Sequence, residues 1–166
     1  MFRPVKREKQ SLSPGEIEAL LKRNTWGVLS LYGKEGYPYG VPVNYAYVDG
    51  AVVFHSAKSG HKWEAIEAND KASFTVVDAS DVVEEEYTTA YKSVIAFGSV
   101  KRLEGEARLR ALRQMTDALA PHVSREVNEK TVKHCDGADV FQLVVHHLSG
   151  KAGRLTPRPY ELTKRI

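Results

Sequence analysis

The chain has 166 residues, of which 42% are hydrophobic and 27% charged, and its formal net charge is +3 at pH 7. This length suits one domain with a substantial core, and the composition is ordinary for a globular protein. The basic residues are dispersed, which does not favour nucleic-acid binding. The single cysteine, Cys135, excludes an internal disulfide framework. Without a signal-like N-terminus or a membrane-length apolar run, we expect a soluble cytoplasmic protein with no membrane partner.

The first third of the chain predicts an arm, a helix and two strands. Residues 1–12 are polar and irregular, and we expect them to form an N-terminal arm. Ser13 and Glu16 make a capping box around a first-turn proline, which predicts a helix start. Strand-forming residues follow at 25–32 and 37–48, separated by a glycine-containing turn. The two prolines of the second strand place it at a sheet edge or a bulge.

The remaining chain predicts four more strands and further helices. Gly98 lies inside the longest expected strand, where it predicts a bulge or a close approach of another backbone. The segment 79–90 reads as a polar connection and 149–154 as a flexible basic one. The expected strands are 51–55, 72–78, 91–103 and 140–148, and the expected helices are 63–68, 106–119 and, more weakly, 124–134.

These elements predict a mostly β protein with some helix, in the α+β class. Six strands without regular βαβ alternation do not suit a doubly wound parallel sheet. An antiparallel barrel or sandwich, with helices plugging its ends, fits better. We expect a single domain over 13–154, preceded by the arm and followed by a tail at 155–166.

The stretch from Phe54 to Lys62 concentrates polar chemistry at a strand–helix junction. It holds two histidines, two lysines and two serines within nine residues. If Ser59 is the N-cap, His61 and Lys62 fall in the first helical turn, where the helix dipole disfavours cations. Free amides at a helix start, together with these donors, would suit a phosphate-sized anion. A solvated, lysine-bearing turn is the alternative that spacing leaves open.

Other reactive residues match no established pattern. Neither Ser30 nor Ser56 lies in a Gly-x-Ser-x-Gly elbow, and the chain has no P-loop or dinucleotide fingerprint. The histidines and the cysteine of the C-terminal third match no zinc-ligand spacing, so we expect no metal. What remains is a candidate phosphate-binding stretch, residues 54–62, on a small β-barrel, with short polar groups and a flat apolar wall nearby. Those are the needs of a phosphorylated aromatic cofactor.

Four motifs occur in order along the chain: Trp26–Ser30, Gly36–Tyr45, Phe54–Ala57 with Gly60–Lys62, and Tyr91–Gly98; Ser149–Lys151 near the end also fits. In this combination the chain resembles FMN-binding split-barrel proteins of the pyridoxamine 5′-phosphate oxidase superfamily, and in particular the 5-nitroimidazole-resistance (Nim-type) branch. The resemblance extends from Asn24 to Arg154. It implies a six-stranded antiparallel split β-barrel with helices packed at its ends. It also implies a homodimer with FMN at the subunit interface.

The resemblance implies the residues of the cofactor site. His55, Ser56 and Lys62 would hold the phosphate, together with the amides of Gly60 and His61. Residues 42–44 would line the flavin ring through backbone groups, and residues 93–94 would contact the phosphate or the ribityl chain. Lys151 or Arg154 would reach across from the partner subunit. The full expected set is Pro42, Val43, Asn44, His55, Ser56, Ala57, Gly60, His61, Lys62, Ser93, Val94 and Lys151.

The expected activity is that of an FMN-dependent, nitroreductase-like oxidoreductase, which passes electrons from a reduced donor to a small acceptor such as a nitroaromatic. His61 is the first candidate for a proton donor, because an imidazole titrates near neutrality. A His61 that matters only through its backbone is the alternative. The chain lacks the C-terminal basic pattern of pyridoxamine phosphate oxidase itself, so a vitamin B6 role is not expected. A flavin- or haem-binding carrier or sensor without turnover is the alternative function. Trp26 is expected in the core, with a place in the wall of the cofactor site as the alternative.

Overall fold

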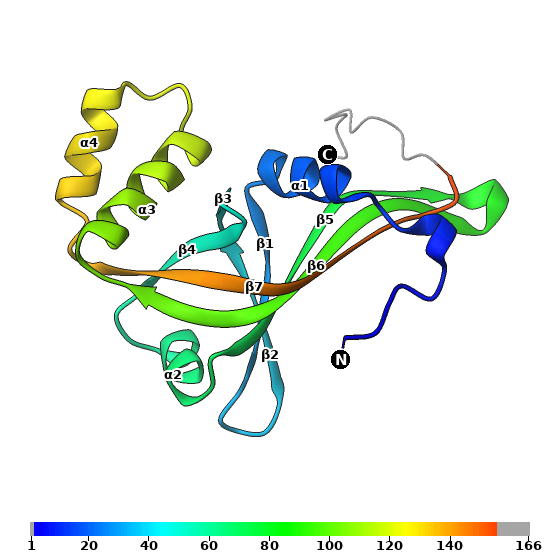
Figure 1. Cartoon of the computed structure of the whole chain (residues 1–166), viewed down its shortest axis with the longest axis horizontal. Helices are drawn as coiled ribbons and strands as arrows, with labels where there is room; N and C mark the ends of the chain where they lie inside the picture. Colours follow the sequence, from blue (N-terminus) through cyan, green and yellow to red (C-terminus); the bar gives the residue numbers. More distant parts are fainter. Residues whose placement is uncertain (1, 156–166) are drawn as a thin grey trace.

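In the computed structural model, which describes residues 2–155, the strands form one antiparallel sheet in the order β2-β1-β5-β6-β7-β4-β3 (Figure 1). Every pairing between neighbouring strands is antiparallel, as the absence of βαβ alternation predicts. The strands are β1 (Trp26–Tyr32), β2 (Pro38–Asn44), β3 (Ala46–Val48), β4 (Ala51–Ala57), β5 (Lys71–Val83), β6 (Thr88–Leu103) and β7 (Ala138–Ala152).

The helices lie at the margins of the sheet (Figure 1). Ser13 caps α1 as predicted: its hydroxyl accepts from the Glu16 amide at 3.3 Å, and the Glu16 carboxylate accepts from the Ser13 amide at 2.9 Å. The predicted 124–134 helix is confirmed as α4, with Ser124 as its N-cap. The helices are α1 (Pro14–Arg23), α2 (His61–Ala68), α3 (Gly105–Leu119) and α4 (Arg125–Lys133), with short 3₁₀ turns η1 (Glu8–Gln10) and η2 (Glu84–Glu86).

The sheet has seven strands rather than the six predicted, because the expected 37–48 strand divides at Tyr45. Its first part, β2, pairs with β1, and its second part, β3, pairs with β4. Tyr45 is fully buried, and its hydroxyl donates to the Leu21 carbonyl at 2.8 Å. The two edge strands are therefore neighbours in the chain without hydrogen bonding to each other, so the sheet curves around a core but is not closed.

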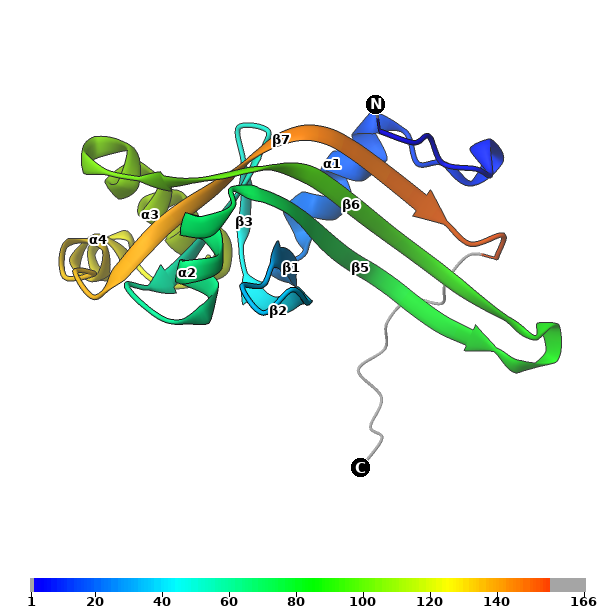
Figure 2. The ribbon, with the colours of Figure 1, turned by 90° about the horizontal axis from the view of Figure 1, so that it is seen from below.

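The prediction that residues 79–90 form a connection without strands is wrong. β5 continues to Val83, turns through η2, and pairs residue by residue with the start of β6, from Ala79 opposite Lys92 to Val83 opposite Thr88. Figure 2 shows this hairpin running out beyond the rest of the sheet. Its polar residues suggested a loop, but the paired backbone satisfies its own hydrogen bonds and so needs no apolar sequence. The expected flexible 149–154 segment is likewise part of β7 up to Ala152.

Gly98 forms the predicted bulge and close approach. The β6–β7 register shifts between Phe97 and Gly98. A Cβ at Gly98 would lie 2.1 Å from the Val144 carbonyl oxygen, so the two backbones touch where only glycine fits. This contact lets the long β6 bend across the core.

Buried residues form two clusters. The larger lies inside the curved sheet and includes Leu29, Phe54, Phe74 and Phe141, with α1 packed over it through its apolar face. The smaller lies under α3 and α4 and includes Leu112, Met115, Val132 and Val140. None of the helices within 2–155 has the length and apolarity needed to cross a membrane.

The expectation that Trp26 belongs to the core is wrong, because its side chain is 55% exposed. Strand alternation explains the difference: Leu29 and Leu31 of β1 face the core, so Trp26 and Val28 face outward. Their outward side is continuous with Thr75 of β5, which pairs with Val28. This surface, formed by β1, β5, β6 and β7, is called the outer face below.

Candidate functional site

The junction between β4 and α2 contains the candidate phosphate-binding stretch, residues 54–62. Gly60, not Ser59, is the N-cap of α2, and it turns the chain with φ of 103°, in the region that favours glycine. The Ser59 side chain makes no capping hydrogen bond. His61 and Lys62 occupy the first turn, as predicted, and no side chain among residues 2–155 caps the amides there. The helix start therefore presents N–H groups that a phosphate could accept from.

Lys62 is the half-buried cation of this junction. Burial lowers its pKa, since partial desolvation disfavours the ammonium form. No carboxylate forms an ion pair with Lys62 in the part of the chain that the structure describes. A desolvated ammonium beside uncapped helix amides suits an anionic group. Such a group would offset the desolvation cost of the ammonium and would accept hydrogen bonds from the amides.

The His61 side chain contacts β2 and the turn that precedes it. Its ring stacks on Tyr39 with centroids 4.1 Å apart, and its Nε2 lies 3.4 Å from a Glu35 carboxylate oxygen. A second contact, between Lys34 Nζ and a Glu64 carboxylate oxygen at 3.2 Å, joins the same turn to α2. These partners could not be predicted from local sequence, since they lie more than twenty residues before α2. The stacking on Tyr39 and the contact with Glu35 fix the orientation of the His61 ring, the candidate proton donor.

A second hollow, of about 500 Å³, borders the other side of the junction. Trp63 of α2 donates from its indole N–H to an Asp139 carboxylate oxygen at 2.8 Å. Arg102 pairs with Glu104 at 2.5 Å and lies 3.7 Å from Asp139. Because the carboxylates of Glu104, Asp136 and Asp139 also line this hollow, it is less suited to an anion than the Lys62 side.

The three β2 residues of the expected site lie at the sheet edge. Pro42 and Asn44 are exposed, whereas Val43 is buried and faces the core. The Asn44 amide donates to the Thr25 carbonyl at 3.1 Å. Tyr39, on the same strand, touches His61, so β2 and the β4–α2 junction are neighbours and can share a ligand.

The structure does not bring Ser93, Val94 and Lys151 to this junction within one chain. Ser93 pairs with Lys151 on β7, whereas His55 pairs with Val140. Eleven residues of β7 separate the two positions, or roughly 36 Å of strand at the usual rise per residue. Val94 is buried in the core, with 1% of its surface exposed. The expected residues thus form two groups, one at the β4–α2 junction and one on the outer face.

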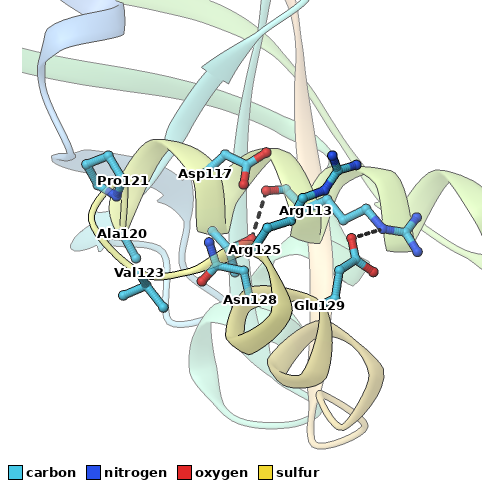
Figure 3. Close-up of a pocket in the computed structure, with 9 residues that line it drawn as sticks. Arg113, Asp117, Ala120, Pro121, Val123, Arg125, Asn128 and Glu129 are labelled. Carbon is cyan, nitrogen blue, oxygen red and sulfur yellow. Dashed lines mark hydrogen bonds and ion pairs between the residues drawn. The ribbon is translucent and has the colours of Figure 1, made fainter.

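A further pocket of about 420 Å³ lies between α3 and α4 (Figure 3). Figure 3 shows an Arg113–Glu129 ion pair, 2.8 Å long, joining the two helices beside it. None of the expected cofactor residues lines this pocket, so it is separate from the candidate cofactor site.

A family profile described as pyridoxamine 5′-phosphate oxidase matches residues 13–152. Among solved structures, a conserved hypothetical protein from Mycobacterium tuberculosis aligns with a TM-score of 0.77 and 17% identity, covering 92% of this chain and 91% of its own. A candidate 5-nitroimidazole antibiotic resistance protein from Bacteroides thetaiotaomicron aligns with a TM-score of 0.66 and 20% identity over 85% of each chain. The FAD and haem binding protein from Mycobacterium smegmatis aligns with a TM-score of 0.72 and 20% identity, covering 91% of this chain and 76% of its own. At these identities the structures show a shared fold. A comparison with curated protein sequences gave no match.

Proposed function

The chain belongs to the pyridoxamine 5′-phosphate oxidase family, and we propose that it is an FMN-binding oxidoreductase that reduces a small acceptor such as a nitroaromatic compound. One observation carries the cofactor part of this proposal. The start of α2 combines uncapped amides with the desolvated Lys62, and no described carboxylate neutralises that lysine. The likeness to a candidate nitroimidazole resistance protein supports the choice of acceptor.

Each part of the junction has a role in this proposal. Lys62 and the amides of Gly60 and His61 hold the phosphate, while His55, Ser56 and Ala57 form the strand end beside it. The exposed backbone at Pro42 and Asn44 lines the flavin ring. Bound FMN supplies the electron transfer. His61, whose ring Tyr39 and Glu35 orient, donates a proton to the reduced acceptor.

We also propose that the protein forms a homodimer in which two chains complete each flavin site. The outer face exposes Trp26, Val77 and Ile95, which are 55%, 48% and 37% accessible on adjacent strands. Contiguous apolar surface of this kind favours association. A two-fold pairing of outer faces would let Ser93 and Lys151 of one chain meet the β4–α2 junction of the other.

Titration of the purified protein with FMN tests the placement of the phosphate. Replacing Lys62 with alanine is expected to weaken binding by about 1.5–3 kcal/mol, the scale of a charge-assisted hydrogen bond, or roughly 10- to 100-fold. Lys22→Ala is the matched control, since Lys22 lies on α1 and pairs there with Glu18. Equal FMN affinity in Lys62→Ala and the wild type would refute the site.

The activity is tested separately on the FMN-loaded protein. We expect NADH or NADPH to bleach the flavin absorbance under anaerobic conditions, and a nitroimidazole to restore it. A yellow protein that neither nicotinamide reduces, and whose chemically reduced form ignores nitroimidazoles, would instead be a flavin carrier or sensor. A protein that takes up haem but no flavin would favour the haem-binding alternative.

A further inference from the structure

The N-terminal arm crosses the outer face and is attached at both of its ends. Phe2 stacks on His147 of β7, with ring centroids 4.8 Å apart and planes 6° from parallel, and also contacts Phe97 of β6 at 5.3 Å. At the other end, Ser11 bridges to Lys151, and the Leu12 amide donates to the Gly150 carbonyl at 3.0 Å. The residues between these two attachments are therefore held over the sheet.

Below the arm lies a hollow of about 500 Å³. Its lining includes four cationic side chains, three from the arm and one from β7, and it includes no carboxylate. The hydroxyls of two serines on β6 and β7 also line it. We call this hollow the arm site and define it by Arg3, Lys6, Arg7, Ser93, Ser149 and Lys151.

The charges of the arm site are not balanced by described protein groups. Within residues 2–155 no ion pair joins any of its four cations to a carboxylate. The Lys151 ammonium instead lies 5.6 Å from the centre of the Tyr91 ring. Four like charges gathered around one hollow repel one another, and a bound anion would relieve that repulsion.

The groups present select the kind of anion. Guanidinium groups such as those of Arg3 and Arg7 bind phosphate oxygens through paired N–H donors, and ammonium and hydroxyl groups add single donors. Four cations exceed what a singly charged ligand such as a small carboxylate needs. The number and type of donors match two linked phosphates.

We infer that the arm site binds a multiply charged anion of the phosphate class, such as the pyrophosphate of a dinucleotide. Two sources share this chemistry: a flavin dinucleotide bound as the cofactor, and a nicotinamide dinucleotide bound as the electron donor. The assignment to either dinucleotide rests on the proposed function, whereas anion binding by the arm does not. Ser93 and Lys151 belong to both sites, so the arm adds Arg3, Lys6 and Arg7 to the outer-face half of the flavin site.

Calorimetric titration of the full chain with pyrophosphate, at constant ionic strength, tests the inference. The variant Arg3→Ala/Lys6→Ala/Arg7→Ala is expected to bind pyrophosphate at least tenfold more weakly than the wild type. The control Lys101→Ala/Arg110→Ala/Arg125→Ala removes the same charge from exposed residues outside the arm site and is expected to stay within twofold. Absence of saturable binding in the wild type, or an equal loss in both variants, overturns the inference.

Nucleotide measurements on the same variants identify the source. If the anion belongs to a flavin dinucleotide, the arm variant loses affinity for FAD but not for FMN. If it belongs to the electron donor, the arm variant raises the KM for NADH or NADPH and leaves flavin affinity unchanged. Pyrophosphate binding by a protein that takes up no flavin would support the arm site and refute the proposed function.

The acidic turn Glu84–Glu86 of a second chain is the competing occupant, because it carries three carboxylates at the tip of the β5–β6 hairpin. Light scattering of the arm variant and of Glu84→Gln/Glu85→Gln/Glu86→Gln distinguishes it. Dimer loss in both variants, together with no pyrophosphate binding by the wild type, would assign the hollow to the partner's hairpin and overturn the inference.

Discussion

Arg23 and Asp78 join the end of α1 to the irregular part of β5. The Arg23 guanidinium donates to both carboxylate oxygens of Asp78, with an Nε–Oδ1 distance of 2.6 Å. The Asn24 amide donates to the same Oδ1 at 2.7 Å and to the Leu20 carbonyl at 2.9 Å. One carboxylate thus holds the last turn of the helix against the sheet, at the point where the β5–β6 register shifts.

This pair predicts a loss of stability in acid. Burial alone would raise the pKa of Asp78, but the hydrogen bonds from Arg23 and Asn24 outweigh it and leave the pKa below its ordinary 3.8. The ionised carboxylate therefore stabilises the fold above about pH 4, and this contribution disappears as the pH falls through the lowered pKa. In urea unfolding at several pH values, Asp78→Asn should lower the free energy of unfolding by about 1–3 kcal/mol at neutrality. Its free energy of unfolding should also fall less steeply in acid than that of the wild type. An equally steep fall in acid for the variant and the wild type would contradict this account.

Gly98 provides a test of packing at the bulge. Alanine there would place its Cβ 2.1 Å from the Val144 carbonyl oxygen, and a backbone neighbour cannot rotate away. We expect Gly98→Ala to lower the free energy of unfolding by about 1–3 kcal/mol or more. Gly15→Ala is the control, since a Cβ at that position of α1 meets nothing within 4 Å. The control should be neutral or stabilising, and similar destabilisation in both variants would rule out the contact as the cause.

Tyr45 predicts a cost for removing one hydroxyl. Its O–H donates to the Leu21 carbonyl, and the side chain is 0% exposed. Tyr45→Phe keeps the ring contacts but leaves a buried helix-end carbonyl without its partner, which should cost about 1–2 kcal/mol. Chemical denaturation measures this change in the free energy of unfolding. Tyr47→Phe, on a half-buried neighbour, should change stability much less.

Lys62 predicts opposite effects on stability and on binding. Burial lowers its pKa, so its charge destabilises the ligand-free fold below that pKa, and the cost fades as the pH rises toward the ordinary 10.5. Lys62→Met keeps the aliphatic stem and removes the charge. Differential scanning fluorimetry at neutral pH should show a slightly higher Tm than the wild type without FMN, and a smaller Tm increase when FMN is added. A lower Tm without FMN would show that the ammonium has a stabilising partner.

Trp26 predicts the effect of a charge on the outer face. Its side chain is 55% exposed, so Trp26→Glu should fold normally. If outer faces pair, the variant should elute as a monomer and lose at least tenfold in FMN affinity, since a buried unpaired charge costs about 1.4 kcal/mol or more. Val127→Glu, at a 52% exposed position on α4, is the control and should remain dimeric. A dimeric Trp26→Glu variant would place the interface elsewhere.

Local chemistry made much of the fold predictable. The capping box at Ser13, the edge position of β2 and the bulge at Gly98 each follow from a residue whose backbone or side chain restricts its neighbours. The α2 boundary differed because the turn required a positive φ, which Gly60 adopts more readily than Ser59. The β5–β6 hairpin escaped prediction because its order comes from backbone pairing rather than from apolar periodicity.

The site was predictable only where its residues are close in sequence. The stretch from His55 to Lys62 is continuous, so its placement at a helix start could be read directly. The stacking of Tyr39 on His61, and the arm over Ser93, depend on strands that meet only after folding. The 1–12, 13–154 and 155–166 divisions remain predictions, and residues 156–166 of the tail lie outside those described.

The position of Tyr45 also decides which strands form the open edges of the sheet. The two open edges of the sheet flank this single residue, and neither edge suits the addition of a foreign strand. β3 has only three residues, and β2 carries Pro38 and Pro42, which lack the N–H that a docking strand would need. Growth into fibrils through these edges is therefore discouraged. If outer faces pair as proposed, their exposed apolar side chains can serve that one contact with little risk of open-ended aggregation.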